Sequence, residues 1–184
     1  MIEFERKKLE PVYDGKVVTL YKDYLTTPGG NTVCYDYIKH KSGGGAGILL
    51  IDDKEYTYLV SQYRNSIDSV DLEIPAGGYG YPGEAGEACA VREAEEETGY
   101  IPGKVYHVSN IVSAIGTFDE RTDIYIGTNL KKGRIKPDPD EYIEIVHIPV
   151  LQAQNMVYEG KIIDSKTIVA LLAYSDMKQK GIIK

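Results

Sequence analysis

The chain lacks tryptophan, has few cysteines and carries no excess of positive charge. Of its 184 residues none is Trp, and two are Cys, namely Cys34 and Cys89. Two cysteines cannot build a disulfide framework, so we expect a reducing compartment. With 21 Lys and Arg against 28 Asp and Glu, the formal net charge is −7. A chain of this net charge does not attract nucleic acid or an anionic membrane. To bind phosphate groups it must first neutralise their charge, for instance with a metal ion.

Long hydrophobic runs are also absent. The longest apolar run, Ala46–Ile51, is too short to cross a bilayer. The first eight residues, MIEFERKK, lack the apolar core of a signal peptide. These absences predict a cytoplasmic protein. The composition, 42% apolar and 27% charged, is typical of globular proteins, and the length predicts one domain over residues 1–184.

Glycine-containing turns divide the chain into short regular elements. Strands at 15–25 and 32–40 flank a turn at 28–31, which predicts an N-terminal antiparallel hairpin. Further strands are expected at 47–51, 56–64, 105–113, 122–130 and 142–149. Helices are expected over 84–98, 150–158 and 164–178, the last capped by Asp164 or Ser165. Mixed strands and helices predict an α/β (α+β) fold, arranged as an α/β/α sandwich with a mixed sheet.

The helix expected over 84–98 carries four carboxylates within five residues. At about 100° per residue, Glu93, Glu96 and Glu97 fall on one face, whereas Glu95 points elsewhere. Like charges at these spacings repel one another unless a cation lies between them. Only oxygen donors are present, which favours Mg²⁺ or Mn²⁺ over zinc. The simplest alternative is a charged helix face in solvent.

The carboxylates do not stand alone. They belong to the pattern Gly78-x5-Glu84-x7-Arg92-Glu93-Ala94-x-Glu96-Glu97-x-Gly99-Tyr100. Leaving out Ala94 and Tyr100, the seven other residues of this pattern would arise at this fixed spacing by chance on the order of once in 10⁸ starting positions. The segment resembles the Nudix box, the signature of the Nudix hydrolase superfamily, with a small Ala94 where a larger aliphatic residue is usual.

The resemblance implies a Nudix fold and Mg²⁺-dependent hydrolysis of a nucleoside diphosphate linked to another moiety. It also implies that Glu93 and Glu97 are direct metal ligands. Glu96 would be either a ligand or a hydrogen-bond partner of metal-bound water. Arg92 would orient these carboxylates, paired with Glu84. The backbone carbonyl that ligates the metal in relatives corresponds to Ala76 or Gly77, because one residue is inserted before the box.

A wider resemblance favours the ADP-ribose pyrophosphatase-like branch of the superfamily. It rests on Gln62–Arg64, on Leu72–Gly77 and on the helix start Gly160–Thr167. In that branch Arg64 and Glu73 would contact the substrate, and Glu120 matches an acidic position on a loop. The stretch Ser113–Arg121 lacks the proline of ADP-ribose enzymes, and Tyr35-Asp36 replaces an arginine common in them.

A general base is implied on the loop before the last strand. Relatives place a glutamate on a mobile loop, and Glu141 corresponds to it best; Asp138 and Asp140 are alternatives. The segment 131–141 holds two prolines and a glycine, so no regular element is expected there.

The expected function is Mg²⁺-dependent cleavage of a nucleoside diphosphate sugar, with ADP-ribose giving AMP and ribose 5-phosphate. Other Nudix pyrophosphatases, acting on a GDP-sugar or a dinucleotide, remain alternatives, as does a non-catalytic sensor with this fold. The sixteen tyrosines suit a wet cleft or a subunit interface. In resembling enzymes the N-terminal segment crosses to a partner, so we expect a homodimer with residues 1–42 in the contact.

Overall fold

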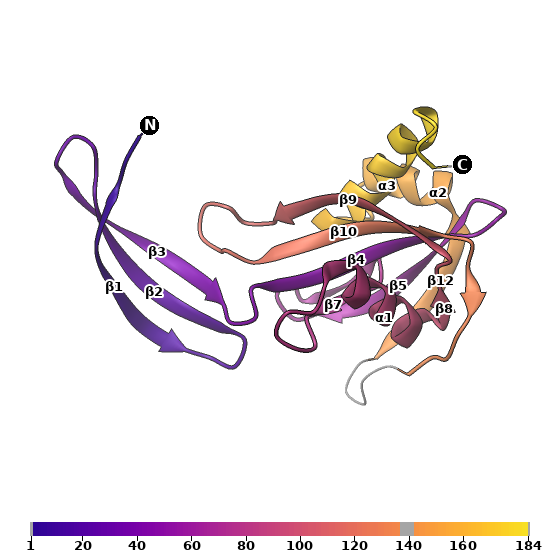
Figure 1. The fold of residues 1–184 in the computed structure, drawn as a ribbon, viewed down its shortest axis with the longest axis horizontal. Helices are drawn as coiled ribbons and strands as arrows, with labels where there is room; N and C mark the ends of the chain where they lie inside the picture. Colours follow the sequence, from indigo (N-terminus) through magenta and orange to yellow (C-terminus); the bar gives the residue numbers. More distant parts are fainter. Residues whose placement is uncertain (1, 137–141, 184) are drawn as a thin grey trace. The chain divides into compact units, whose positions relative to one another are not determined.

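The computed structural model describes residues 2–136 and 142–183 (Figure 1). By the contacts between its residues, the chain divides into two compact units. One contains the residues up to Gly44 together with Val112–Arg121, and the other contains Gly45–Ile111 and the residues from Thr122 onward. The expectation of a single domain over 1–184 stays a prediction.

The first unit is built on a three-stranded antiparallel sheet in the order β1-β2-β3. Its strands are β1 (Glu5–Asp14), β2 (Val18–Thr26) and β3 (Thr32–His40). The predicted hairpin is therefore confirmed, and Gly30 provides the positive φ of its turn. Sequence analysis missed β1, because this strand is polar and mostly exposed and so shows no alternation. Its Pro11 is tolerated because β1 lies at an edge, beside a register shift.

The second unit holds a mixed seven-stranded sheet. The main path runs β12-β5-β4-β10-β9, with β6 paired to β5 and β7 paired to β4. The strands are β4 (Gly44–Ile51), β5 (Tyr56–Arg64), β6 (Ser69–Glu73), β7 (Ala76–Gly78), β9 (Lys104–Val112), β10 (Arg121–Thr128) and β12 (Ile143–Pro149). Two short strands, β8 (Tyr100–Ile101) and β11 (Lys131–Lys132), pair separately. Strand β8 was not expected, and β11 shows that the expectation of no regular element in 131–141 was wrong at its first two residues, since two residues carry no periodicity.

Strand β4 is buried on both faces and supplies side chains to two cores. Ile48 and Leu50 pack in one core with residues of α1 (Gly86–Thr98). Leu49 and Ile51 pack in the other core with residues of α2 (Val150–Tyr158) and α3 (Ser165–Gln179). Since successive side chains of a strand point to opposite faces, α1 lies on one face of the sheet and α2 and α3 on the other (Figure 1). The expected α/β/α sandwich is confirmed.

The helix ends follow their local chemistry. Helix α1 begins at Gly86, two residues later than expected, because the Glu84 side chain is turned toward other partners and Ala85 provides no side-chain cap. The helix ends at Thr98, as expected, and is followed by Gly99, whose φ of 73° is left-handed. Helix α3 begins after Asp164, whose carboxylate accepts a hydrogen bond from the Thr167 N–H.

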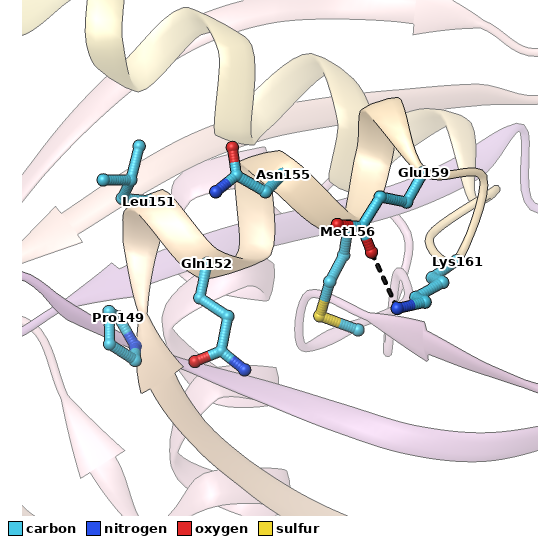
Figure 2. A pocket seen from close by; sticks show the side chains of 7 residues that line it. All are labelled: Pro149, Leu151, Gln152, Asn155, Met156, Glu159 and Lys161. Carbon is cyan, nitrogen blue, oxygen red and sulfur yellow. Dashed lines mark ion pairs between the residues drawn. The ribbon is translucent and has the colours of Figure 1, made fainter.

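Helix α2 borders a cavity of about 550 Å³ (Figure 2). Its lining residues are Pro149, Leu151, Gln152, Asn155, Met156, Glu159 and Lys161. Glu159 and Lys161 form an ion pair with each other at 2.7 Å. Glu159 is the single carboxylate among these lining residues.

Candidate metal and phosphate site

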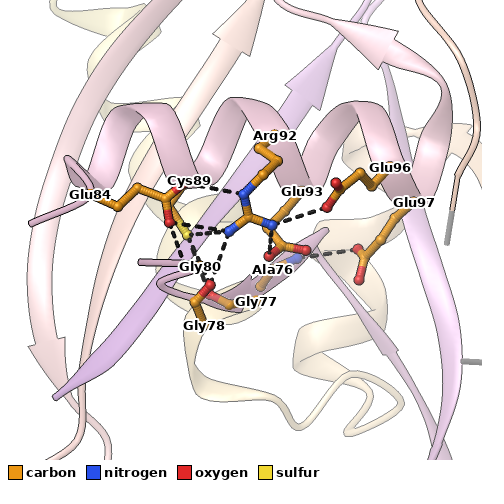
Figure 3. A network of polar contacts seen from close by, with 10 residues as sticks. All are labelled: Ala76, Gly77, Gly78, Gly80, Glu84, Cys89, Arg92, Glu93, Glu96 and Glu97. Carbon is orange, nitrogen blue, oxygen red and sulfur yellow. Dashed lines mark hydrogen bonds and ion pairs between the residues drawn. The ribbon is translucent and has the colours of Figure 1, made fainter. Parts of the chain in front are cut away.

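The carboxylates predicted to share a helix face lie between α1 and β7 (Figure 3). Arg92 stands at their centre. Its Nη1 donates to Glu93 at 2.6 Å and to Glu96 at 3.0 Å, and its Nη2 donates to the Gly78 carbonyl at 3.0 Å. One planar guanidinium therefore fixes two carboxylates of α1 relative to the end of β7.

The same guanidinium pairs with Glu84, as the resemblance implied. Arg92 Nε and Nη2 donate to the two Glu84 oxygens at 3.1 and 3.2 Å, and Glu84 also accepts the Gly80 N–H at 2.7 Å. The Glu84 side chain is only 3% exposed. The hydrogen bond with Arg92 is the largest of the effects that lower the pKa of Glu84 below its ordinary value, so this buried carboxylate is charged.

Glu93 is pressed against the backbone of β7. A Cβ atom at Gly77 would collide with the Glu93 carboxylate and force this side chain to move, so glycine permits the close approach. Glycine is needed again across the strand pair, because a Cβ at Gly45 would collide with the Gly77 carbonyl oxygen. The Gly-Gly sequence of β7 therefore brings main-chain oxygens beside the carboxylates of α1.

Glu97 is almost fully buried and faces the start of β7. Its Oε2 accepts a hydrogen bond from the Ala76 N–H at 3.2 Å. Ala76 pairs with Gly47 of β4, so the orientation of this carboxylate depends on the backbone of the sheet. The carbonyl ligand was expected to be that of Ala76 or Gly77, and this assignment stays a prediction.

Cys89 of α1 lies beside this site and is fully buried. Its Sγ is 3.5 Å from the carbonyl oxygens of both Gly77 and Gly78, to which the thiol donates. Burial raises the pKa of the Cys89 thiol to about 11. Since the thiol is protonated at neutral pH, Cys89 is unsuited to act as a nucleophile.

The donor set fits an oxygen-ligated divalent cation. Glu84, Glu93 and Glu96 share one guanidinium, and Glu97 adds a fourth carboxylate, so the cluster carries an excess of negative charge. In the arrangement of the described residues, no three His, Cys, Asp or Glu side chains are grouped closely enough to hold an ion. Arg92 accounts for this, because it holds Glu93 and Glu96 itself. Cation binding therefore requires these two side chains to turn from the guanidinium.

Arg64 and Glu73, the predicted substrate contacts, bind each other. Arg64 Nε and Nη2 donate to Glu73 Oε1 and Oε2 at 2.6 and 2.7 Å. Burial alone would raise the pKa of Glu73, but the hydrogen bond from Arg64 and the charge of Lys166 outweigh it and lower the pKa. Arg64 keeps a side chain 41% exposed, so its outer edge is accessible. Sequence reasoning missed Lys166, which also binds Glu73, because the two residues lie 93 positions apart.

The other predicted residues lie elsewhere. Glu120 belongs to the first unit, where its carboxylate is 3.7 Å from His40 Nε2. The same unit has a cavity of about 600 Å³ that includes Tyr35, Asp36 and Phe118 among its lining residues. Glu141 and the alternative bases Asp138 and Asp140 lie outside the described residues, so the assignment of a general base stays a prediction.

Comparisons with known proteins agree with this geometry. A model of the NUDIX domain matches residues 41–170, and the chain therefore belongs to the Nudix family. It is 31% identical over 172 residues to a methanol dehydrogenase activator of Bacillus methanolicus, covering 91% of each chain. It is 29% identical to an ADP-ribose pyrophosphatase of Bacillus subtilis, covering 92% of this chain and 91% of that protein. It is 30% identical to a GDP-mannose pyrophosphatase of Citrobacter koseri, covering 80% and 81%.

The fold has a counterpart among solved structures. The crystal structure of an ADP compounds hydrolase superposes with a TM-score of 0.84 at 17% identity, covering 98% of this chain and 97% of the other. Nudix hydrolases generally depend on divalent metals. Among the described helices, none has the length and apolar character needed to cross a membrane.

Proposed function

We propose that this protein is a Mg²⁺-dependent Nudix hydrolase, with Mn²⁺ as an alternative metal, that cleaves the pyrophosphate of a nucleoside diphosphate sugar. ADP-ribose is the leading substrate, and water would be added across its P–O–P linkage to give AMP and ribose 5-phosphate. The observation that carries this proposal is the arrangement of three carboxylates, Glu93, Glu96 and Glu97, around Arg92 and the glycine backbone of β7. It is supported by the relatives named ADP-ribose pyrophosphatase.

Each residue of the site has a role in this proposal. Glu93, Glu97 and the Gly77 carbonyl would hold the cation, and Glu96 would hold it or water near it. A bound divalent cation would neutralise pyrophosphate charge and make water more acidic. Arg92, anchored by buried Glu84, holds Glu93 and Glu96 together beside the end of β7, from where both carboxylates would turn onto the cation when it binds.

Arg64, Glu73 and Glu120 are proposed to contact the substrate. Arg64 is best placed for an anionic group, because two of its nitrogens are already directed by Glu73 while its outer edge is exposed. Glu73 would then act through Arg64 as well as through its own carboxylate. The Glu120 side chain is 36% exposed, and its carboxylate lies 3.7 Å from His40 Nε2.

We further propose that the protein is a cytoplasmic homodimer. The first unit leaves Val12, Tyr13, Val17 and Tyr35 at least half exposed, and an apolar surface of this kind favours a partner. Strand β1 also leaves one edge without a partner in the strand order of its sheet. Both cysteines are free, which agrees with a reducing compartment.

A substrate panel tests the proposed activity. ADP-ribose, GDP-mannose and a dinucleotide would each be incubated with Mg²⁺, with and without EDTA, and the products separated by chromatography. The proposal expects EDTA-sensitive release of AMP and ribose 5-phosphate as the fastest reaction. Faster cleavage of GDP-mannose would favour the second candidate, which the GDP-mannose pyrophosphatase relative supports. No cleavage of any compound would favour the sensor.

A further inference from the structure

A buried threonine at the start of α3 holds the backbone that leads into the carboxylate site. The Thr167 Oγ1 accepts a hydrogen bond from the Ile74 N–H at 2.8 Å and donates one to Asp164 Oδ2 at 2.6 Å. Thr167 is fully buried, and so is Ile74. Because the hydroxyl proton is committed to Asp164, an oxygen lone pair is left for Ile74. The hydroxyl is therefore an oriented acceptor rather than a freely rotating group.

The segment that Thr167 holds ends at Glu97. Pro75 has no N–H, and its carbonyl accepts a hydrogen bond from the Ile48 N–H at 2.9 Å. The next residue, Ala76, donates its N–H to Glu97 Oε2 at 3.2 Å. Ile74 and Ala76 supply the two backbone donors of the segment 74–76. One donor is directed to Thr167 and the other to the carboxylate of Glu97.

The residue before this segment is held from the same helix turn. Lys166 binds the Glu73 carboxylate and also lies 3.0 Å from Asp164 Oδ1. Two neighbouring residues of α3 therefore hold two neighbouring residues at the end of β6, across 93 positions of sequence. This double attachment explains why the path into β7 is fixed although the strand itself has only three residues.

We propose that Thr167 is a positioning residue for the metal site. It fixes Ile74, and through Ile74 and Pro75 it sets the position of the Ala76 N–H that orients the Glu97 carboxylate. This inference rests on the proposed function in assigning Glu97 to the metal. Thr167 touches neither metal nor substrate; it acts only through the segment 74–76.

Replacing the hydroxyl with a methyl group separates this role from packing. Thr167→Val keeps the size and branching of the side chain but removes the acceptor for the Ile74 N–H. Thr167→Ser keeps the acceptor. Thr57→Val is the matched control, because Thr57 is also fully buried and its Oγ1 has no hydrogen-bond partner among the residues that the structure describes. Thr57→Val therefore replaces a buried hydroxyl with a methyl group, as Thr167→Val does, but breaks no hydrogen bond among the described residues.

The readouts are Mg²⁺ affinity and kinetics. Affinity is taken from the rise of Tm with Mg²⁺ concentration, measured without substrate, and kcat and KM for ADP-ribose are measured separately. Thr167→Val should weaken the apparent Mg²⁺ affinity by ~3–10-fold, since removing outer partners of ligands costs up to about 10–100-fold. It should lower kcat more than it changes KM. Thr167→Ser should restore affinity to within about twofold, and Thr57→Val should leave affinity and kcat unchanged.

Several outcomes would overturn the inference. A Thr167→Val protein with a lower Tm but wild-type Mg²⁺ affinity and kcat would show that Thr167 only packs. If this variant does not fold, Asp164→Asn takes its place, because it keeps a capping oxygen while weakening the orientation of the hydroxyl. Its Mg²⁺ affinity should then fall at least about twofold, and an unchanged affinity would refute the role.

The same measurements distinguish this inference from the proposed function. A wild-type protein whose Tm rises with Mg²⁺ but which cleaves no substrate would contradict the proposed function. The affinities of the Thr167 variants would still decide whether Thr167 positions Glu97. A wild-type protein with neither a Mg²⁺-dependent Tm nor hydrolysis would overturn both.

Discussion

Replacing Arg92 with lysine should destabilise the protein although the charge is kept. The guanidinium serves three carboxylates and the Gly78 carbonyl from three nitrogen atoms. A single ammonium nitrogen cannot reach all the acceptors spread around the edge of the guanidinium group, so at least two charged hydrogen bonds should be lost. Each such bond contributes about 1.5–3 kcal/mol when buried. The Arg92 side chain is 32% exposed, so we discount for solvent and expect a total loss of about 2–3 kcal/mol.

Urea unfolding with EDTA present measures this loss without any contribution from metal binding. A double-mutant cycle that combines Arg92→Lys with Glu84→Gln isolates the interaction free energy between Arg92 and the buried Glu84. The effect should also depend on pH. The folded pKa of Glu84 lies below its ordinary value of 4.5, so the stabilisation is present above that pH and is lost as the pH falls through the folded pKa. A loss under about 0.5 kcal/mol at pH 7 would refute the view that Arg92 organises the site.

The remaining predictions concern catalysis, core stability and assembly. Glu97→Gln should lower kcat at least about 10²-fold, equivalent to about 2.7 kcal/mol, while the far-UV circular dichroism stays that of wild type; kcat within threefold of wild type would remove Glu97 from the mechanism. Thr57→Val should raise the free energy of unfolding by ~1 kcal/mol, because a buried hydroxyl without a partner among the described residues is replaced by a methyl group; chemical denaturation that shows a loss would contradict this. Sedimentation at micromolar concentration should show a homodimer, and replacing exposed Tyr13 and Tyr35 with serine should shift the equilibrium toward monomer; a wild-type protein that sediments only as a monomer would rule the dimer out.

The parts of the fold that sequence predicted were those with strong local signals. The run Gly47–Ile51 and the two C-terminal helices are long or apolar enough to show their type, and their bounds differ from the structure by at most three residues. Strand β1 was missed because it is held by cross-strand pairing, and not by an apolar face. Helix α1 was placed two residues early because Glu84 favours a helix locally but is drawn to Arg92 in the folded chain.

The residues of the candidate site likewise fall into those that a local sequence pattern predicts and those that only tertiary contacts bring together. The spacing of Glu93, Glu96 and Glu97 on one helix face is a local property, and helical geometry predicts it directly. The pairing of Arg64 with Glu73 and the attachment of Thr167 to Ile74 depend on how β6 and α3 meet, and no local pattern reports such contacts. The sequence could therefore identify the carboxylates of α1. The contacts of β6 and α3 that position the neighbouring backbone could be identified only from the folded structure.

The most direct test of the account compares ADP-ribose hydrolysis by wild type and Glu93→Gln over a range of Mg²⁺ concentrations. AMP release would be followed by chromatography, with Glu95→Gln as the matched control, since Glu95 belongs to the same helix but binds the backbone of Arg134. The account predicts EDTA-sensitive hydrolysis by wild type and by Glu95→Gln, and at least about 10²-fold slower hydrolysis by Glu93→Gln. Equal rates for all three proteins, or full activity in EDTA, would contradict the claim that the carboxylates of α1 form a metal-dependent pyrophosphatase site.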